Sequence, residues 1–246
     1  MNFQLGLLTP VVLFVAWLLL LLATLSVPIT KTIFLFRLTA AASSKLFDSS
    51  ASASVVFGVW GYCTSGTDVS IVGIDHDTPA ECSRRHLGYT FDSTVAEVLH
   101  VSGLENDISK GITAALALHP VVVALTFVTL LISLFMLRRG SNGTSRLPSL
   151  LALGMSLFTA VLTTVVFLID IIIPAVVRKA VHKDSDGIVT VGTGNAPWLV
   201  FAAAILLWIA VFFSSFGVVF GNKRHARTTT DTEKYRANGQ RAHLYQ

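Results

Sequence analysis

The chain has 246 residues and a net charge of +4, yet only 13% of its residues are charged and 53% are hydrophobic. A soluble domain carries about a quarter charged residues, so this composition argues against an ordinary soluble globular protein. The apolar residues form four blocks, at residues 5–27, 112–137, 150–173 and 197–220. Each block exceeds the roughly 18 residues that separate a spanning helix from a buried core helix. We therefore predict four transmembrane spans.

The first block could be an uncleaved anchor or a cleaved signal peptide. Its 23 residues carry no charge, and no lysine or arginine precedes them. The apolar region of a signal peptide is shorter, roughly 7–15 residues, and follows a positively charged segment. We expect an uncleaved first span, and a cleaved signal peptide is the alternative.

Basic residues give a divided signal for orientation, because cytoplasmic loops are normally the ones enriched in lysine and arginine. The connection 138–149 and the tail 222–246 are basic, which favours a cytoplasmic side holding both termini. Basic residues also follow the first and third spans, on the opposite side. The basic residues on the side of the termini are Arg138, Arg139, Arg146, Lys223, Arg224 and Arg227. Those on the opposite side are Lys31, Arg37, Lys45, Arg178, Lys179 and Lys183.

The two cysteines resolve the orientation. Cys63 and Cys82 both lie in the long first connection, residues 28–111. Disulfides persist in oxidising compartments and are rare in the cytosol, so an isolated pair in a loop predicted to be outside indicates one disulfide. The alternative is two unrelated thiols; two cysteines alone do not make a zinc site. We predict a Cys63–Cys82 disulfide, an extracellular first connection and cytoplasmic termini.

The first connection should contain a small sheet. The run "TAAASSKLFDSSASAS" (39–54) is polar and resembles an exposed loop, whereas residues 54–63, 69–74 and 86–91 are rich in strand-forming residues. From residue 93 the apolar residues recur every three or four positions, which predicts an amphipathic helix leading into the second span. The second outer connection, 174–196, is too short to fold alone, and the polar tail 222–246 is expected to be disordered.

One string in this connection resembles a known family. Phe57, Gly58, Trp60, Gly61 and Tyr62 precede Cys63 and form the glycine–apolar–tryptophan–x–x–cysteine pattern of claudin-like four-span proteins. The ordered set of this string, the second cysteine and two further motifs more closely resembles the fungal PalI family of pH-response and eisosome-associated proteins. Those further motifs are Leu87-Gly88-Tyr89 and His119-Pro120. The cysteine spacing is wider than in claudins, which argues against tight-junction-like assembly.

The same string has a physical interpretation of its own. Gly58 and Gly61 allow close backbone approach or a bulge. Trp60 and Tyr62 are expected on one strand face, where amphipathic rings favour the membrane interface. A structural role in the ectodomain core is the principal interpretation, and direct contact with a partner is the alternative.

Within the spans, His119 and Asp170 are the ionisable residues nearest the bilayer, and both should lie in the outer leaflet. An unpaired aspartate costs about 2.5–3.5 kcal/mol at the bilayer centre, and contact with His119 would offset part of this cost. Because histidine changes charge near physiological pH, the pair would be proton-sensitive. This proton-sensitive pair is the alternative; the principal interpretation has Pro120 at the first helical position and Asp170 reaching water.

The remaining candidates are weaker. Gly217 and Gly221 form a small-xxx-small pattern suited to helix packing or dimerisation, and Lys223, Arg224 and Arg227 form a basic flank suited to anionic lipid. The loop histidines His76, His86 and His100 are expected to be solvated rather than metal-binding. The sequon at Asn142 falls in the connection predicted to be cytoplasmic and should be unused.

These observations predict a four-helix transmembrane bundle with a small extracellular, disulfide-linked antiparallel sheet of claudin-like type. Catalytic motifs are absent from the sequence, so we expect neither an enzyme nor a cofactor, and the partners are the lipid bilayer and another membrane protein, not nucleic acid. The PalI resemblance implies a plasma-membrane accessory protein of alkaline pH signalling that assists a seven-span sensor. A structural organiser of membrane microdomains is the alternative function, and a channel or transporter is a third. The protein partner would be the seven-span sensor or, as an alternative, further copies of this chain in a homo-oligomer.

Overall fold

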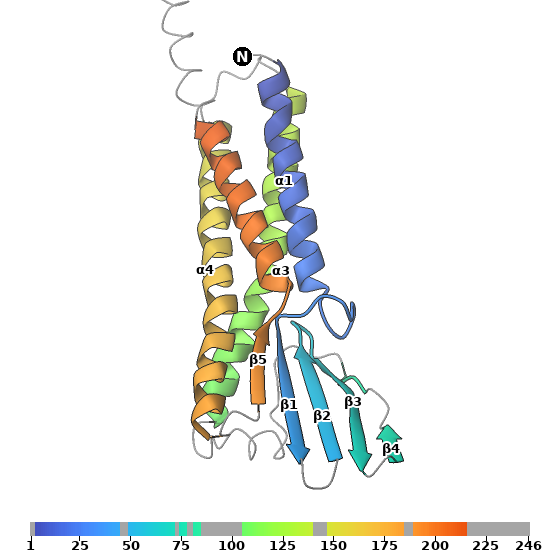
Figure 1. The fold of residues 1–246 in the computed structure, drawn as a ribbon. Coiled ribbons are helices and arrows are strands. Elements are labelled where there is room, and N and C mark those ends of the chain that lie inside the picture. Colours follow the sequence, from blue (N-terminus) through green and yellow to red (C-terminus); the bar gives the residue numbers. More distant parts are fainter. Residues whose placement is uncertain are drawn as a thin grey trace, which may run out of the picture.

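The computed structural model describes residues 3–44, 49–71, 74–77, 81–84, 105–139, 147–184 and 189–215. Four helices form an elongated bundle, and an antiparallel sheet lies at one end of it (Figure 1). This arrangement confirms the predicted fold class of a four-helix membrane bundle with a small disulfide-linked sheet.

The four helices match the four apolar blocks but differ from them in length. The helices are α1 (Phe3–Thr24), α3 (Glu105–Arg139), α4 (Leu147–Asp184) and a final helix, Ala196–Ser215. At about 1.5 Å per residue, the 35 and 38 residues of α3 and α4 exceed a hydrocarbon core of about 30 Å. Three helices contain segments long and apolar enough to cross a membrane, Ala115–Met136, Leu150–Lys179 and Ala196–Ser215, and α1 contains a shorter apolar segment, Leu8–Thr24.

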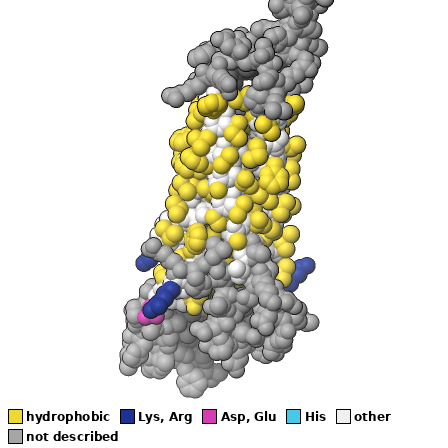
Figure 2. All heavy atoms as spheres, turned by 180° about the vertical axis from the view of Figure 1, so that it is seen from behind, with side chains coloured by type: hydrophobic (Ala, Val, Ile, Leu, Met, Phe, Trp, Pro, Cys, Tyr) yellow, Lys and Arg dark blue, Asp and Glu magenta, His cyan; other side chains and the backbone are white. Residues whose placement is uncertain are grey.

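The outer surface of the bundle is apolar, as a lipid-facing surface requires. Figure 2 shows hydrophobic side chains covering the length of the helices, with basic side chains at the end of this band. Inside the bundle, side chains from all four helices form one buried cluster, with α1 packed on α3 and α3 on α4. Its most enclosed large residues are Leu13, Val122, Val166, Val200 and Leu207.

The sheet has five antiparallel strands in the order β4-β3-β2-β1-β5. The strands are β1 (Phe36–Ser44), β2 (Ser49–Phe57), β3 (Tyr62–Ile71), β4 (Ile74–Asp77) and β5 (Val189–Thr193). A second buried cluster joins this sheet to the helix ends. It comprises Leu35, Phe36, Phe57, Val59, Leu116 and Ala196.

The polar run 39–54 does not form the exposed loop that we predicted. It contains most of β1 and the first part of β2, which pair in an unbroken register from Phe36↔Phe57 to Ser44↔Ser49. Alanine and serine have low strand propensity, but local propensity yields to pairing with neighbouring strands. The apolar ends of the two strands, where Phe36 and Phe57 stack at 4.6 Å between ring centroids, attach this hairpin to the core.

Three further boundaries differ from the sequence predictions. The strand predicted at 69–74 is divided between β3 and β4, and residues 86–91 lie outside the described residues. The third span was predicted to end at residue 173, but α4 continues to Asp184 with Pro174 inside it. The helix predicted from residue 93 is described from Glu105 onward.

The second outer connection contributes β5, which the sequence analysis did not predict. This strand pairs with β1 and so completes the sheet begun by the first connection. Asn195 fixes the junction: its side-chain amide donates to the Thr32 carbonyl, and its side-chain oxygen accepts from the Phe34 amide. The final helix begins at the next residue, Ala196.

Candidate functional site

The string at residues 57–63 forms a turn rather than the continuous strand that we predicted over 54–63. β2 ends at Phe57 and β3 begins at Tyr62, while the Gly58 amide donates to the Gly61 carbonyl at 2.9 Å. Gly61 has a φ of +152°, a conformation that favours glycine. Trp60 therefore lies in the turn and Tyr62 in β3, so the prediction that both share one strand face is wrong.

This turn is attached to the end of α1. The Ser26 hydroxyl accepts a hydrogen bond from the Val59 amide at 2.8 Å, and the Thr24 carbonyl accepts one from the Trp60 indole at 2.7 Å. Thr24 is the last residue of α1, and the terminal carbonyls of a helix lack partners within it. The Trp60 indole supplies such a partner, so this tryptophan fixes the sheet to the first helix.

Gly58 allows the close approach that this attachment requires. A Cβ atom at this position would collide with the Val27 backbone oxygen and would lie 2.7 Å from the Val27 nitrogen. The predicted need for close backbone approach is therefore met at Gly58. At Gly61, a Cβ atom would collide with the Ser83 hydroxyl.

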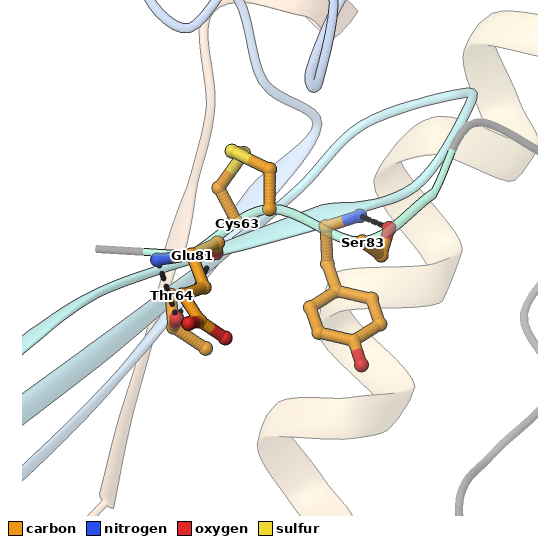
Figure 3. Close-up of a disulfide and its surroundings, with 6 residues drawn as sticks. Cys63, Thr64, Glu81 and Ser83 are labelled. Carbon is orange, nitrogen blue, oxygen red and sulfur yellow. Dashed lines mark hydrogen bonds between the residues drawn. A yellow bond between two sulfur atoms is a disulfide. The ribbon is translucent and has the colours of Figure 1, made fainter. Parts of the chain in front are cut away.

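Cys63 and Cys82 form the predicted disulfide, with 4.0 Å between their Cα atoms. Residues 81–83 lie along the first residues of β3 (Figure 3). The Thr64 amide donates to the Glu81 carbonyl at 2.8 Å, and the Ser83 amide donates to the Tyr62 carbonyl at 2.9 Å. The Ser83 hydroxyl accepts from the Tyr62 amide at 3.1 Å. The disulfide is thus surrounded by backbone pairing on both sides.

Removing this disulfide should lower stability without abolishing the bundle. The bond closes a loop over a sequence separation of 19, which corresponds to about 3 kcal/mol in the chain-entropy model. The Cys63→Ser/Cys82→Ser variant should therefore unfold its sheet at lower denaturant concentration than the parent, measured by near-ultraviolet circular dichroism in detergent. Equal midpoints for the oxidised parent and this variant would contradict the expected role.

His119 and Asp170 lie side by side in the interior of the bundle. The His119 Nε2 and Asp170 Oδ2 atoms are 3.2 Å apart, and the two side chains are 3% and 2% exposed. The principal interpretation of these residues is wrong in both parts: Pro120 lies well inside α3 rather than at its first position, and Asp170 does not reach water. The other ring nitrogen of His119, Nδ1, is buried and has no hydrogen-bond partner among the described residues.

A strip of buried hydroxyl groups lies on α3 and α4, and sequence reasoning missed it. On each helix the hydroxyls recur every three or four residues, a spacing that could have revealed a shared face. The strip comprises Thr126 and Thr129 on α3 and Ser156, Thr159 and Thr163 on α4.

These hydroxyl groups are largely satisfied within their own helices. Each donates to a backbone carbonyl three or four residues earlier, at 2.7–2.9 Å. One contact crosses between the helices, with 3.4 Å between the Thr129 and Thr159 hydroxyl oxygens. Small polar residues of this kind let helices approach closely in a membrane. The strip therefore serves helix packing and leaves the His119–Asp170 pair as the only described ion pair.

Several predicted residues lie outside the described part of the chain, and their predictions stay open. They are Leu87, Gly88, Tyr89, Gly217, Gly221, Lys223, Arg224 and Arg227, together with His86, His100 and the sequon at Asn142. His76 belongs to β4, where its backbone pairs with Val69. Within the described ranges, no group of three or more histidine, cysteine or acidic side chains could hold a metal ion.

Comparison with known proteins gives one finding. No curated protein matches the chain, but a model of the SUR7/PalI family matches residues 5–213. The match covers all four helices up to the last described turn, the whole sheet, the turn at 57–63, the disulfide and the buried pair. The chain belongs to the SUR7/PalI family.

Proposed function

We propose that this protein is a non-catalytic accessory component of fungal alkaline pH signalling in the plasma membrane, where it assists a seven-span sensor. Family membership supports a membrane accessory protein. The observation that carries the finer proposal is the buried His119–Asp170 pair, in which the imidazole Nε2 and the carboxylate Oδ2 lie 3.2 Å apart inside the bundle. A change at either side chain would leave the other polar group buried without its partner in a medium of low dielectric constant.

The pair is well placed to transmit such a change to the outer sheet. Leu116, one helical turn before His119 on α3, belongs to the cluster that joins the bundle to the sheet, and Ile173, three residues after Asp170 on α4, packs against that cluster. A change in the spacing of α3 and α4 at the pair would therefore act on the base of the sheet. The sheet is the surface that we expect a sensor to contact.

The disulfide supports an extracellular sheet, since such bonds persist in oxidising compartments. The final helix returns to the end of the bundle where α1 begins (Figure 1). With the sheet outside, both termini are cytoplasmic in this proposal. No catalytic step is assigned to the protein, and its partner is the sensor or a second copy of the chain.

The test is complementation in a fungal strain that lacks this gene. The parent should restore growth at alkaline pH and processing of the downstream transcription factor, whereas Asp170→Asn, at matched membrane abundance, should restore neither. Gly154→Ala is the control, because a Cβ atom there would meet no atom within 4 Å. Normal alkaline growth of the deleted strain, together with static punctate patches of the tagged protein, would overturn the proposal and favour the microdomain organiser.

A further inference from the structure

A groove of about 850 Å³ lies between the outer end of α4 and β5. One wall is apolar and consists of Ile171, Pro174 and Ala175. Arg178 and Lys179 follow them on α4, and residues 191–193 of β5 form the opposite wall. The groove therefore changes from apolar to basic along a single helix.

This change coincides with the end of the apolar segment of α4. The apolar segment Leu150–Lys179 ends at the two basic residues. Ile172 and Val176, on the same stretch of α4, are 55% and 58% exposed and belong to the lipid-facing surface. The apolar part of the groove is thus continuous with the surface that contacts acyl chains, while its basic part reaches the level of lipid headgroups.

The structure describes no acidic side chain in contact with either of the two cations. Arg178 and Lys179 are both exposed, and in the described ranges no carboxylate lies within ion-pair distance of either. A third basic residue, Arg37, is on the neighbouring strand, where it is the registered partner of Gly192. Its guanidinium lies over the Phe34 ring, 5.0 Å from the ring centroid. Arg178 and Lys179 therefore form a local pair of exposed cations beside β5 that an anionic group could contact.

The backbone of β5 adds hydrogen-bonding capacity to the groove. β5 is an edge strand, paired on one side with β1, and an edge strand presents backbone groups that lack a ladder partner. A Cβ atom at Gly192 would meet nothing within 4 Å, so there is open space beside the backbone of β5 at this position. Phosphate oxygens accept hydrogen bonds from guanidinium, ammonium and backbone amide groups.

We propose that this groove binds a lipid with an anionic, phosphate-bearing headgroup from the leaflet on the side of the sheet. The phosphate lies between Arg178 and Lys179 and the open edge of β5, and the first methylene groups of the lipid contact Ile171, Pro174 and Ala175. A free phosphate ion would satisfy the cations but would leave the apolar wall unused. The lipid would thereby join α4 to the sheet.

The binding experiment uses the full chain in phosphatidylcholine nanodiscs with added phosphatidylinositol as the probe, and counts retained lipids by native mass spectrometry. Because each basic residue near anionic lipid contributes about fivefold, Arg178→Gln/Lys179→Gln should weaken the preference for phosphatidylinositol about thirtyfold. Lys31→Gln/Arg84→Gln removes the same charge from exposed positions elsewhere and should keep most of the preference.

Gly192→Leu provides an independent test, because it fills the groove without changing the charge. We expect it also to lose the preference while retaining the circular dichroism spectrum of the parent. Equal loss in the two glutamine double variants would show general surface attraction and overturn the site. Displacement of phosphatidylinositol by inorganic phosphate would show an anion site without lipid selectivity and overturn the lipid assignment. Retention of the preference in Gly192→Leu would also overturn it.

Discussion

His119→Leu is expected to destabilise the folded protein by about 3–5 kcal/mol, the usual cost of removing one partner of a buried ion pair. The substitution leaves the Asp170 carboxylate, whose side chain is 2% exposed, with no described partner between α3 and α4. Packing does not compensate, because leucine matches the shape of the imidazole only roughly. The free energy of unfolding can be measured by denaturant titration of the protein in detergent micelles, followed by the fluorescence of its tryptophans.

The double variant His119→Leu/Asp170→Leu distinguishes the charge effect from a packing effect. Replacing both partners of a buried pair by apolar residues is often neutral or stabilising, so the double variant should recover most of the stability lost in His119→Leu. Additive losses would instead show that the two side chains do not stabilise each other. If the double variant folds but fails to complement the deleted strain, the pair acts in signalling rather than in stability.

Gly58→Ala is the second substitution with a large expected effect, about 4 kcal/mol. The new methyl group would displace the Val27 backbone, and overpacking of this kind costs about 1–3 kcal/mol. The displacement would also break the hydrogen bonds from Val59 to Ser26 and from Trp60 to Thr24, each worth about 1 kcal/mol. Thermal unfolding and the yield of monodisperse protein would report the loss.

Gly154→Ala is the matched control for this experiment, because it adds the same methyl group on α4 where no atom lies within 4 Å. Its stability should remain within about 0.5 kcal/mol of the parent, as for most surface substitutions. Parental stability of Gly58→Ala would mean that the turn does not dock on α1 as closely as Val27 and Gly58 indicate.

The bundle and the disulfide could be predicted because each depends on a simple signal. Long apolar runs indicate transmembrane spans, and two cysteines in one loop indicate a disulfide between them. The β1–β2 hairpin could not be predicted in this way. Its alanines and serines have low strand propensity, and they form strands because each lies opposite a partner in the other strand. In residues 54–63 the strand-forming Val59, Trp60 and Tyr62 obscured a turn set by Gly58 and Gly61.

The strand β5 escaped prediction for a different reason. Its pairing with β1 joins residues 149 to 157 positions apart, from Ala40 and Val189 to Phe36 and Thr193, and no local pattern in either segment indicates the other. The hydroxyl strip was missed because threonine within an apolar helix is usually satisfied by its own backbone, as Thr126 is. Only the contact between Thr129 and Thr159 shows that hydroxyl groups of the two helices meet.

The position of β5 in the sheet has a consequence for biosynthesis. β1 and β2 emerge early and can pair as soon as they are translocated, but the side of β1 opposite β2 stays uncovered until α3, α4 and β5 have followed. Gly194 and Asn195 then close the junction by bonding to the backbone at Leu35, Phe34 and Thr32. Completion of the sheet therefore requires that the third helix has crossed the bilayer, so an exposed β1 edge marks a chain whose membrane insertion is unfinished.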